Sequence, residues 1–216
     1  MLLHQYLEAL LGSRTKIKIL RTLHRHRGKE FTIRELADFI GVSHTGVRKT
    51  LKDLYEMNVI TLKAIGKSHT VSMNSSSHLL PLMDAIFAYE EETLSHLEKS
   101  IKEGLCGEDY IKRVLLFGSV ARMEEEPRSD IDLLILTDDK ERIEETVSQL
   151  QSEISRRFGN PIAPHILTPG EAKEPSRAPL MREINEQCIT VCDRQGDAGN
   201  VNENQKRPER ATRQLP

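Results

Sequence analysis

Three short, mainly apolar runs in the second half of the chain constrain its fold more than any other feature. They cover residues 114–117, 131–136 and 162–167. Apolar runs of this length are typical of strands that are buried on both faces of a sheet. The segment 140–158 between the last two runs has apolar residues at helical spacing instead. We therefore predict a small mixed sheet with helices packed on it, closed by a helix over 180–187 and a strand over 189–192.

The first 76 residues have a different pattern, in which three short amphipathic helices precede a β-hairpin. Thr32 and Glu35 have the spacing of a capping box, which starts the second helix, and Gly41 ends it. Ser43 is placed to cap the third helix. The helices are expected over 15–27, over 32–40 and from 43 onward, and the strands of the hairpin over 59–65 and 69–73.

The third of these helices has a basic outer face. Residues 1–75 contain 13 Lys and Arg against 6 Asp and Glu, so this half carries the positive charge of a chain whose net charge is -2. A cationic helix that follows a short turn suits the major groove of DNA, where phosphate contacts position the protein. The candidate DNA-binding residues are His44, Thr45, Arg48, Lys49 and Lys52 on the helix and Lys67 in the hairpin, with Lys63 and His69 beside it.

Residues 15–73 resemble a winged helix-turn-helix domain of the kind found in bacterial and archaeal transcription regulators. The resemblance depends on Glu35-Leu36-Ala37, on Gly41-Val42-Ser43 and on the hairpin, which would be the wing. It implies DNA as a partner. The alternative is that the basic face serves solubility or docks another protein.

A long amphipathic segment separates the two patterns. With Pro81 in its first turn, it runs to about Gly104, and nothing within the small first module is an obvious partner for it. It either joins the domains or pairs two subunits into a homodimer. We predict four parts: a DNA-binding domain over 1–76, a linker or dimerisation helix over 77–105, a second domain over 106–192 and a disordered tail over 193–216.

The sequence also narrows the location of the protein. No run approaches the ~18 apolar residues that a membrane-spanning helix needs, and the first segment lacks a cationic leader. We expect a cytoplasmic protein with no membrane partner. Its three cysteines, Cys106, Cys188 and Cys192, are too few for a disulfide framework, so we expect them to be reduced and mostly buried.

Two short motifs in the second half predict a phosphate site and a metal site side by side. Gly118 and Ser119 follow the first apolar run, where backbone N–H groups and the serine hydroxyl can hold phosphate oxygens. Asp130 and Asp132 are two residues apart on the second strand, so both side chains face the same side. Mg²⁺ prefers a few carboxylates together with substrate phosphates and water. Together, the Gly-Ser turn and the two aspartates therefore predict phosphoryl transfer assisted by Mg²⁺.

The spacing of these motifs resembles the signature of the DNA polymerase beta-like nucleotidyltransferase superfamily, and its minimal nucleotidyltransferases in particular. The shared sequence is Gly-Ser-x-Ala-Arg from residue 118 and Ser-Asp-Ile-Asp-Leu from residue 129, within a resemblance that covers 110–192. The order of helices and strands predicts an α+β fold overall. The resemblance implies Mg²⁺ or Mn²⁺ and a nucleoside triphosphate substrate. Transferred by position, Gly118, Ser119 and Arg122 bind nucleotide, Asp130 and Asp132 bind the metal, and Ser119 joins the two aspartates in catalysis. The sequence contains no acceptor-binding signature, so the acceptor is unknown, with a protein side chain and a small molecule both open.

The sequence departs from this family in two places. Met123 stands where such domains often have glycine, and Glu124 to Glu126 follow it. The superfamily also places a third carboxylate on a later strand, whereas the third apolar run here contains no acid. His165 or Glu171 is a candidate to replace it. The departure leaves open a second function, a catalytically weak or inactive regulator that senses nucleotide and passes that state to DNA affinity.

Overall fold

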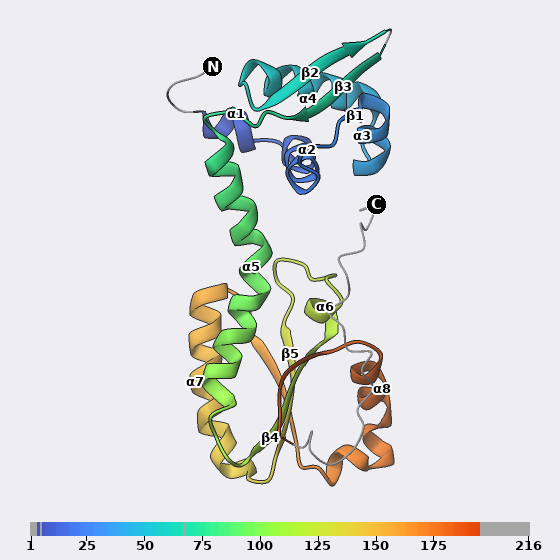
Figure 1. The fold of residues 1–216 in the computed structure, drawn as a ribbon. Coiled ribbons are helices and arrows are strands. Elements are labelled where there is room, and N and C mark those ends of the chain that lie inside the picture. Colours follow the sequence, from blue (N-terminus) through green and yellow to red (C-terminus); the bar gives the residue numbers. More distant parts are fainter. Residues whose placement is uncertain (1–3, 5, 67, 195–216) are drawn as a thin grey trace. The chain divides into compact units, whose positions relative to one another are not determined.

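The computed structural model describes residues 4, 6–66 and 68–194 (Figure 1). Within these residues the chain forms two compact units that divide between Glu92 and Thr93. No helix of the described residues is long and apolar enough to cross a membrane.

The first unit is a helix-turn-helix domain with a three-stranded sheet. Its elements are α1 (Leu7–Leu11), α2 (Arg14–Arg25), β1 (Phe31–Thr32), α3 (Ile33–Ile40), α4 (His44–Glu56), β2 (Ile60–Ile65) and β3 (Ser68–Met73). Thr32 and Glu35 form the expected capping box, and Gly41 ends α3 in the left-handed conformation. The hydroxyl of Ser43 accepts from the backbone N–H of Gly46 and so caps α4. The expected hairpin β2–β3 is present, and β1 pairs with β3 at its side.

Helix α5 (Leu80–Leu105) follows the hairpin and contributes to both cores. Met83 and Phe87 in its first half are buried against the first unit, which corrects our expectation that this module offers the helix no partner. Ion pairs from α2 support this packing, with Arg21 Nη2 2.6 Å from Glu90 Oε1 and Arg25 Nε 3.1 Å from Glu91 Oε1.

The second unit is a four-stranded mixed sheet with helices on both faces. Its elements are β4 (Ile111–Phe117), α6 (Gly118–Ala121), β5 (Ile131–Thr137), α7 (Lys140–Phe158), β6 (Ile162–Leu167), two 3-10 turns (Glu171–Lys173 and Pro175–Arg177), α8 (Ala178–Glu186) and β7 (Ile189–Asp193). The strand order is β6-β5-β4-β7, in which only the β5–β6 pair is parallel. Pro164 lies in β6, which is an edge strand and pairs only with β5. Proline is tolerated in an edge strand because the outer side of the strand has no neighbour to which an N–H could donate.

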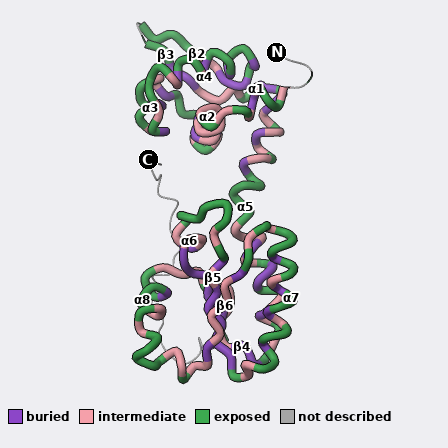
Figure 2. Tube along the Cα trace, turned by 180° about the vertical axis from the view of Figure 1, so that it is seen from behind, coloured by how far each residue is buried: buried purple, intermediate pink, exposed green. Residues whose placement is uncertain are grey.

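Side chains of the central strands alternate between two apolar layers. Leu133 and Ile135 of β5 pack with α7 and the second half of α5. Leu134 and Leu136 point to the other face, where they pack with Ile184 of α8. The tube in Figure 2 shows these buried strands between α7 and α8. Alternation places consecutive residues of β5 on opposite faces, so Asp132 shares the α8 face with Leu134.

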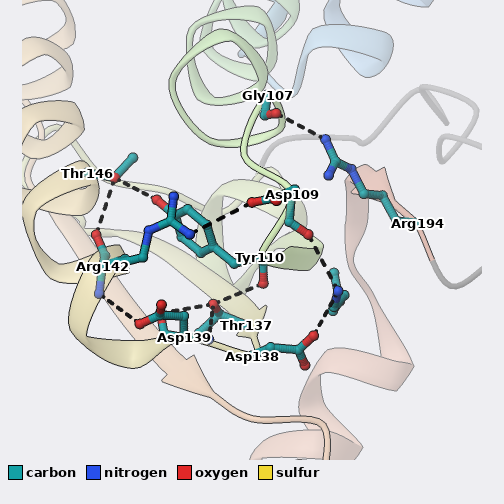
Figure 3. Close-up of polar contacts among 10 residues, drawn as sticks. Gly107, Asp109, Tyr110, Thr137, Asp138, Asp139, Arg142, Thr146 and Arg194 are labelled. Atoms are coloured by element: carbon teal, nitrogen blue, oxygen red, sulfur yellow. Dashed lines mark hydrogen bonds and ion pairs between the residues drawn. The ribbon is translucent and has the colours of Figure 1, made fainter.

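A polar network holds the end of the sheet where β4 begins and β5 ends (Figure 3). The Arg142 guanidinium lies 4.3 Å from the centre of the Tyr110 ring, and the Tyr110 hydroxyl is 3.0 Å from Thr146 Oγ1. The buried hydroxyl of Thr137 donates to the carbonyl oxygen of Tyr110 at 3.1 Å. These contacts satisfy the polar groups at the end of the sheet opposite to Gly118, so this region is structural.

The same region corrects the expectation that the cysteines are reduced. Cys106, just after α5, forms a disulfide with Cys192 of β7, while Cys188 is a half-buried thiol that is not part of a disulfide. Arg194, which we assigned to the disordered tail, donates from Nη2 to the carbonyl oxygens of Cys106 and Gly107 at 2.8 and 3.2 Å. Asp193 belongs to β7. The remainder of that predicted tail, 195–216, lies outside the described residues.

Candidate active site

The candidate site lies where β4 ends and β5 begins. Gly118 directly follows β4 and has a φ of 72°, in the left-handed region that glycine tolerates best. A Cβ added at Gly118 would lie 2.1 Å from Asp132 Oδ2, so the aspartate side chain occupies the space over the glycine. The motif needs glycine here because any side chain would displace this carboxylate. Ser119, the next residue, is half-buried in α6.

The two aspartates of β5 differ in their surroundings. Asp132 is half-buried and pairs in register with Phe117, the residue before Gly118, whereas Asp130 is exposed just before the strand. Burial, above all, raises the pKa of Asp132; His165 lowers it, and the negative charges of Glu183 and Asp130 raise it further. The register thus brings the Gly-Ser turn and the Asp-x-Asp strand together as the sequence predicts.

The loop after α6 turns back through a strained residue. Met123 has a φ of 55°, which explains why glycine would suit this position. The backbone N–H of Glu124 then donates to the carbonyl oxygen of Ser119 at 2.9 Å. Glu125 and Glu126 are exposed.

The structure shows partners for Arg122 that the sequence did not indicate. Its guanidinium is 3.2 Å from Glu124 Oε2 through Nε and 3.1 Å from Glu183 Oε1 through Nη1. Hydrogen bonds to Glu183 and then to Glu124 raise the pKa of Arg122 above its ordinary value. Glu183 comes from α8, and nothing in the sequence reveals which residue of that helix reaches the Gly-Ser turn.

The strand β6 supplies no third carboxylate to the site. Ala163 is the residue in register with Asp132, and His165, in register with Leu134, shares the face of Asp132. The ring of His165 lies against Phe117, with 5.4 Å between ring centroids. Of the two candidates for the missing acid, His165 is therefore the one near the Asp-x-Asp strand.

Glu171 does not reach the site. Glu171 follows the end of β6, which pairs with the end of β5 at Leu136. It therefore lies at the end of these strands that is far from Asp130 and Asp132. Its carboxylate accepts from Lys140 Nζ at 2.7 Å and from the backbone N–H of Thr168 at 2.8 Å. The hydrogen bond from Lys140, followed by that from the Thr168 backbone, lowers the pKa of Glu171 to about 2. Its role is structural.

The donor set at Asp130 and Asp132 fits Mg²⁺ better than a metal held by protein ligands alone. Among the described residues, no group of three or more His, Cys, Asp or Glu side chains is arranged to hold a metal ion. Mg²⁺ commonly binds one or two carboxylates and completes its coordination with water and substrate phosphates. The two aspartates beside a Gly-Ser turn provide that arrangement.

The basic face of α4 is exposed, as the sequence predicts. His44, Thr45, Arg48, Lys49 and Lys52 all lie on the surface. The ion pair of Lys52 with Glu56, at 3.9 Å, is loose. In the hairpin, Lys63 is ion-paired with Glu30, which makes it a poorer phosphate contact than expected, and Lys67 lies outside the described residues.

Comparisons with known proteins agree with both parts of the fold. A family model described as Polymerase beta, Nucleotidyltransferase matches residues 99–194, and one described as HTH domain matches residues 15–68. A search of curated proteins finds no match to the sequence.

Several solved structures are weakly similar to the chain. A crystal structure of a toxin-antitoxin with AMP-PNP has 20% identity over 46% of this chain and 76% of its own, with a TM-score of 0.36. NolR from Sinorhizobium fredii has 21% identity over 40% and 78%, with a TM-score of 0.32. ZitR from Lactococcus lactis has 18% identity over 71% and 87%, with a TM-score of 0.36. Structural similarities with TM-scores this low support no conclusion about function.

The family models and the strand register therefore lead to the same assignment. Residues 99–194 are accordingly assigned to a nucleotidyltransferase domain and residues 15–68 to an N-terminal helix-turn-helix domain.

Proposed function

We propose that the protein is a Mg²⁺-dependent nucleotidyltransferase coupled to a DNA-binding winged helix. The close approach of Gly118 to Asp132 supports this proposal, because the turn that we propose for phosphate lies directly against the carboxylate that we propose for the metal. Both motifs lie inside the segment that matches the family model. The substrate is a nucleoside triphosphate, and the acceptor is a hydroxyl group of a protein or a small molecule.

Each residue has a separate part in the proposed reaction. Gly118 and Ser119 bind the triphosphate, Arg122 contacts a phosphate, and Asp130 and Asp132 hold Mg²⁺. The acceptor oxygen attacks the α-phosphorus, the bond from that phosphorus to the bridging oxygen of the β-phosphate breaks, and pyrophosphate leaves. The proton of the acceptor hydroxyl passes to water or to a nearby base. When bound, Mg²⁺ offsets the negative charge on the phosphoryl oxygens.

A second candidate function is a regulator that binds nucleotide without transferring it. The absence of an acid from β6 favours it, because Ala163 and His165 occupy the positions beside Asp132 and Leu134. In this version the nucleotide state of the second domain alters the DNA affinity of the first.

Transfer of radiolabel separates the two functions. The full chain is incubated with α-labelled triphosphates and Mg²⁺, with and without cell extract, and compared with Asp130→Ala plus Asp132→Ala. Asp138→Asn, at the other end of β5, is the matched control. Label transfer that the double variant abolishes and the control retains supports the enzyme. Nucleotide binding without transfer supports the regulator.

DNA binding by α4 is tested through its salt dependence. Arg48→Ala and Lys49→Ala are expected to weaken DNA affinity, and each lost phosphate contact reduces the slope of log affinity against log salt by about 0.9. Arg156→Ala, which removes an exposed charge from α7, should leave both unchanged. Equal affinity and slope in the α4 variants would indicate that this face docks a protein instead.

The proposal includes a cytoplasmic location and a homodimer, since two-fold pairing suits palindromic DNA sites. Light scattering on the purified chain measures the oligomeric state directly, and a monomer at all concentrations would refute the dimer.

A further inference from the structure

We propose that Glu183 is a positioning residue for the triphosphate, which holds the Arg122 guanidinium beside the Gly-Ser turn in the orientation that meets phosphate. The inference rests on the proposed nucleotide site and adds to it a residue from outside both sequence motifs. Helix α8, which carries Glu183, lies about 60 residues further along the chain than Arg122, and the ion pair between them is a long-range contact.

Helix α8 is anchored so that it can hold a side chain in place. Ile184, next to Glu183, is fully buried in the layer between α8 and the sheet. One turn further, Gln187 Nε2 donates to the carbonyl oxygen of Ala121 at 3.2 Å, which ties the end of α8 to α6. The backbone that carries Glu183 is therefore fixed relative to the residue that precedes Arg122.

The contacts leave Arg122 free to bind phosphate. A guanidinium has five N–H donors in a planar fork. Arg122 uses Nε for Glu124 and Nη1 for Glu183, at 3.2 and 3.1 Å. Among the described residues no other group accepts from Arg122, so the N–H groups of Nη2 and the second one of Nη1 remain for phosphate oxygens. Two carboxylates thus fix the plane of the guanidinium without using all its donors.

The two carboxylates come from different parts of the fold. Glu124 belongs to the loop after α6, and its backbone N–H is bonded to the carbonyl oxygen of Ser119. Glu183 belongs to α8. Arg122 therefore links the loop to the helix across the turn that binds the triphosphate in our proposal. Without the anchored partner on α8, the arginine would be held only by a neighbour on its own exposed loop.

Glu183 also acts on the electrostatics of the site, because its charge is among those that raise the pKa of Asp132. Removing it makes the site less negative, which by itself favours a polyanionic ligand. A control variant that also removes one negative charge from α8 is needed to separate this electrostatic effect from the loss of positioning. Glu186→Gln provides it, since Glu186 is exposed on the same helix and forms no ion pair with any residue that the structure describes.

The test is a double-mutant cycle on the binding of ATP and of adenosine in the presence of Mg²⁺, measured by calorimetry on the full chain. Glu183→Gln is expected to weaken ATP binding by about two- to fivefold, the range of an ion pair between partly exposed groups. Arg122→Ala should weaken it more. In that background Glu183→Gln should no longer weaken ATP binding and should act only through its charge, as Glu186→Gln does. Adenosine, which has no phosphate, should bind all the variants equally.

Steady-state kinetics give a second readout. Glu183→Gln should raise the KM for the triphosphate and leave kcat nearly unchanged, because the lost contact orients a binding group. Glu183→Asp should recover part of the loss. If Glu183→Gln binds ATP as Glu186→Gln does, or keeps its effect without Arg122, the inference is overturned while the nucleotide site stands. If the wild-type chain binds no ATP, the proposed function and the inference are both overturned.

Discussion

Replacing Gly118 with alanine tests the close approach on which the candidate site depends. Alanine at a φ of 72° lies in the left-handed region, which costs about 1–2 kcal/mol for a residue with a Cβ. Its Cβ would also meet Asp132 Oδ2 at 2.1 Å and Asp132 Cγ at 2.9 Å, distances at which the aspartate has to move. We therefore expect Gly118→Ala to destabilise the domain by at least the backbone cost and to remove nucleotide binding.

Gly159→Ala is the matched control for this experiment. Gly159 ends α7 with a φ of 82°, and a Cβ there would have nothing within 4 Å. The Gly159→Ala variant should be destabilised by the same backbone cost of about 1–2 kcal/mol, but its new Cβ does not contact the candidate site. The difference between the two variants isolates the displacement of Asp132. Urea unfolding measures the stability of each, and ATP titration measures its site.

The expected result is that both variants unfold more easily than the wild type, but only Gly118→Ala loses ATP binding. The reasoning would be refuted if Gly118→Ala matched Gly159→Ala in stability and kept wild-type ATP affinity. In that case Asp132 would have room to accommodate a side chain, and the proximity of turn and carboxylate would not be essential.

Three further changes test other parts of the structure. Reduction of the Cys106–Cys192 bond, whose cysteines are 86 residues apart, should lower the free energy of unfolding by about 4–5 kcal/mol on the chain-entropy model, measured by urea unfolding with and without reductant; equal midpoints would show that the bond does not form. Met123→Gly should stabilise the domain by about 0.5–1 kcal/mol, because it relieves left-handed strain at an exposed side chain, and a loss of stability in the same assay would contradict this. The pKa of Glu171, lowered from 4.5 to about 2, favours the folded state above pH 4.5, and this contribution disappears as the pH falls from there toward 2. Glu171→Gln should therefore flatten the dependence of unfolding on pH in that window; a variant that keeps the wild-type slope would reject the role of Glu171.

Local sequence patterns predicted most of the fold. Thr32 with Glu35 and Ser43 marked helix starts, because capping depends on residues within one turn. The apolar runs likewise marked β4, β5 and β6, because the burial of a strand is visible in a few consecutive residues. The short strand β1 was missed, since two residues give no periodicity.

The features that sequence reasoning missed depend on contacts between distant segments. The motif spacing placed Gly118 near Asp132, because both lie on neighbouring strands. It could not show that Glu183 reaches Arg122, since the rotation of α8 is set by the packing of Ile184. The pairing of Cys106 with Cys192 depends in the same way on where α5 ends relative to β7. Three cysteines in a sequence carry no such geometry.

Calorimetric titration of the full chain with ATP, in the presence and absence of Mg²⁺, tests the central claim most directly. The account predicts binding that requires Mg²⁺ in the wild type and is lost in Asp132→Asn, while Asp138→Asn binds as the wild type does. Absence of binding to the wild type, or binding that Asp132→Asn retains, would contradict a nucleotide site at the Gly-Ser turn and the paired aspartates.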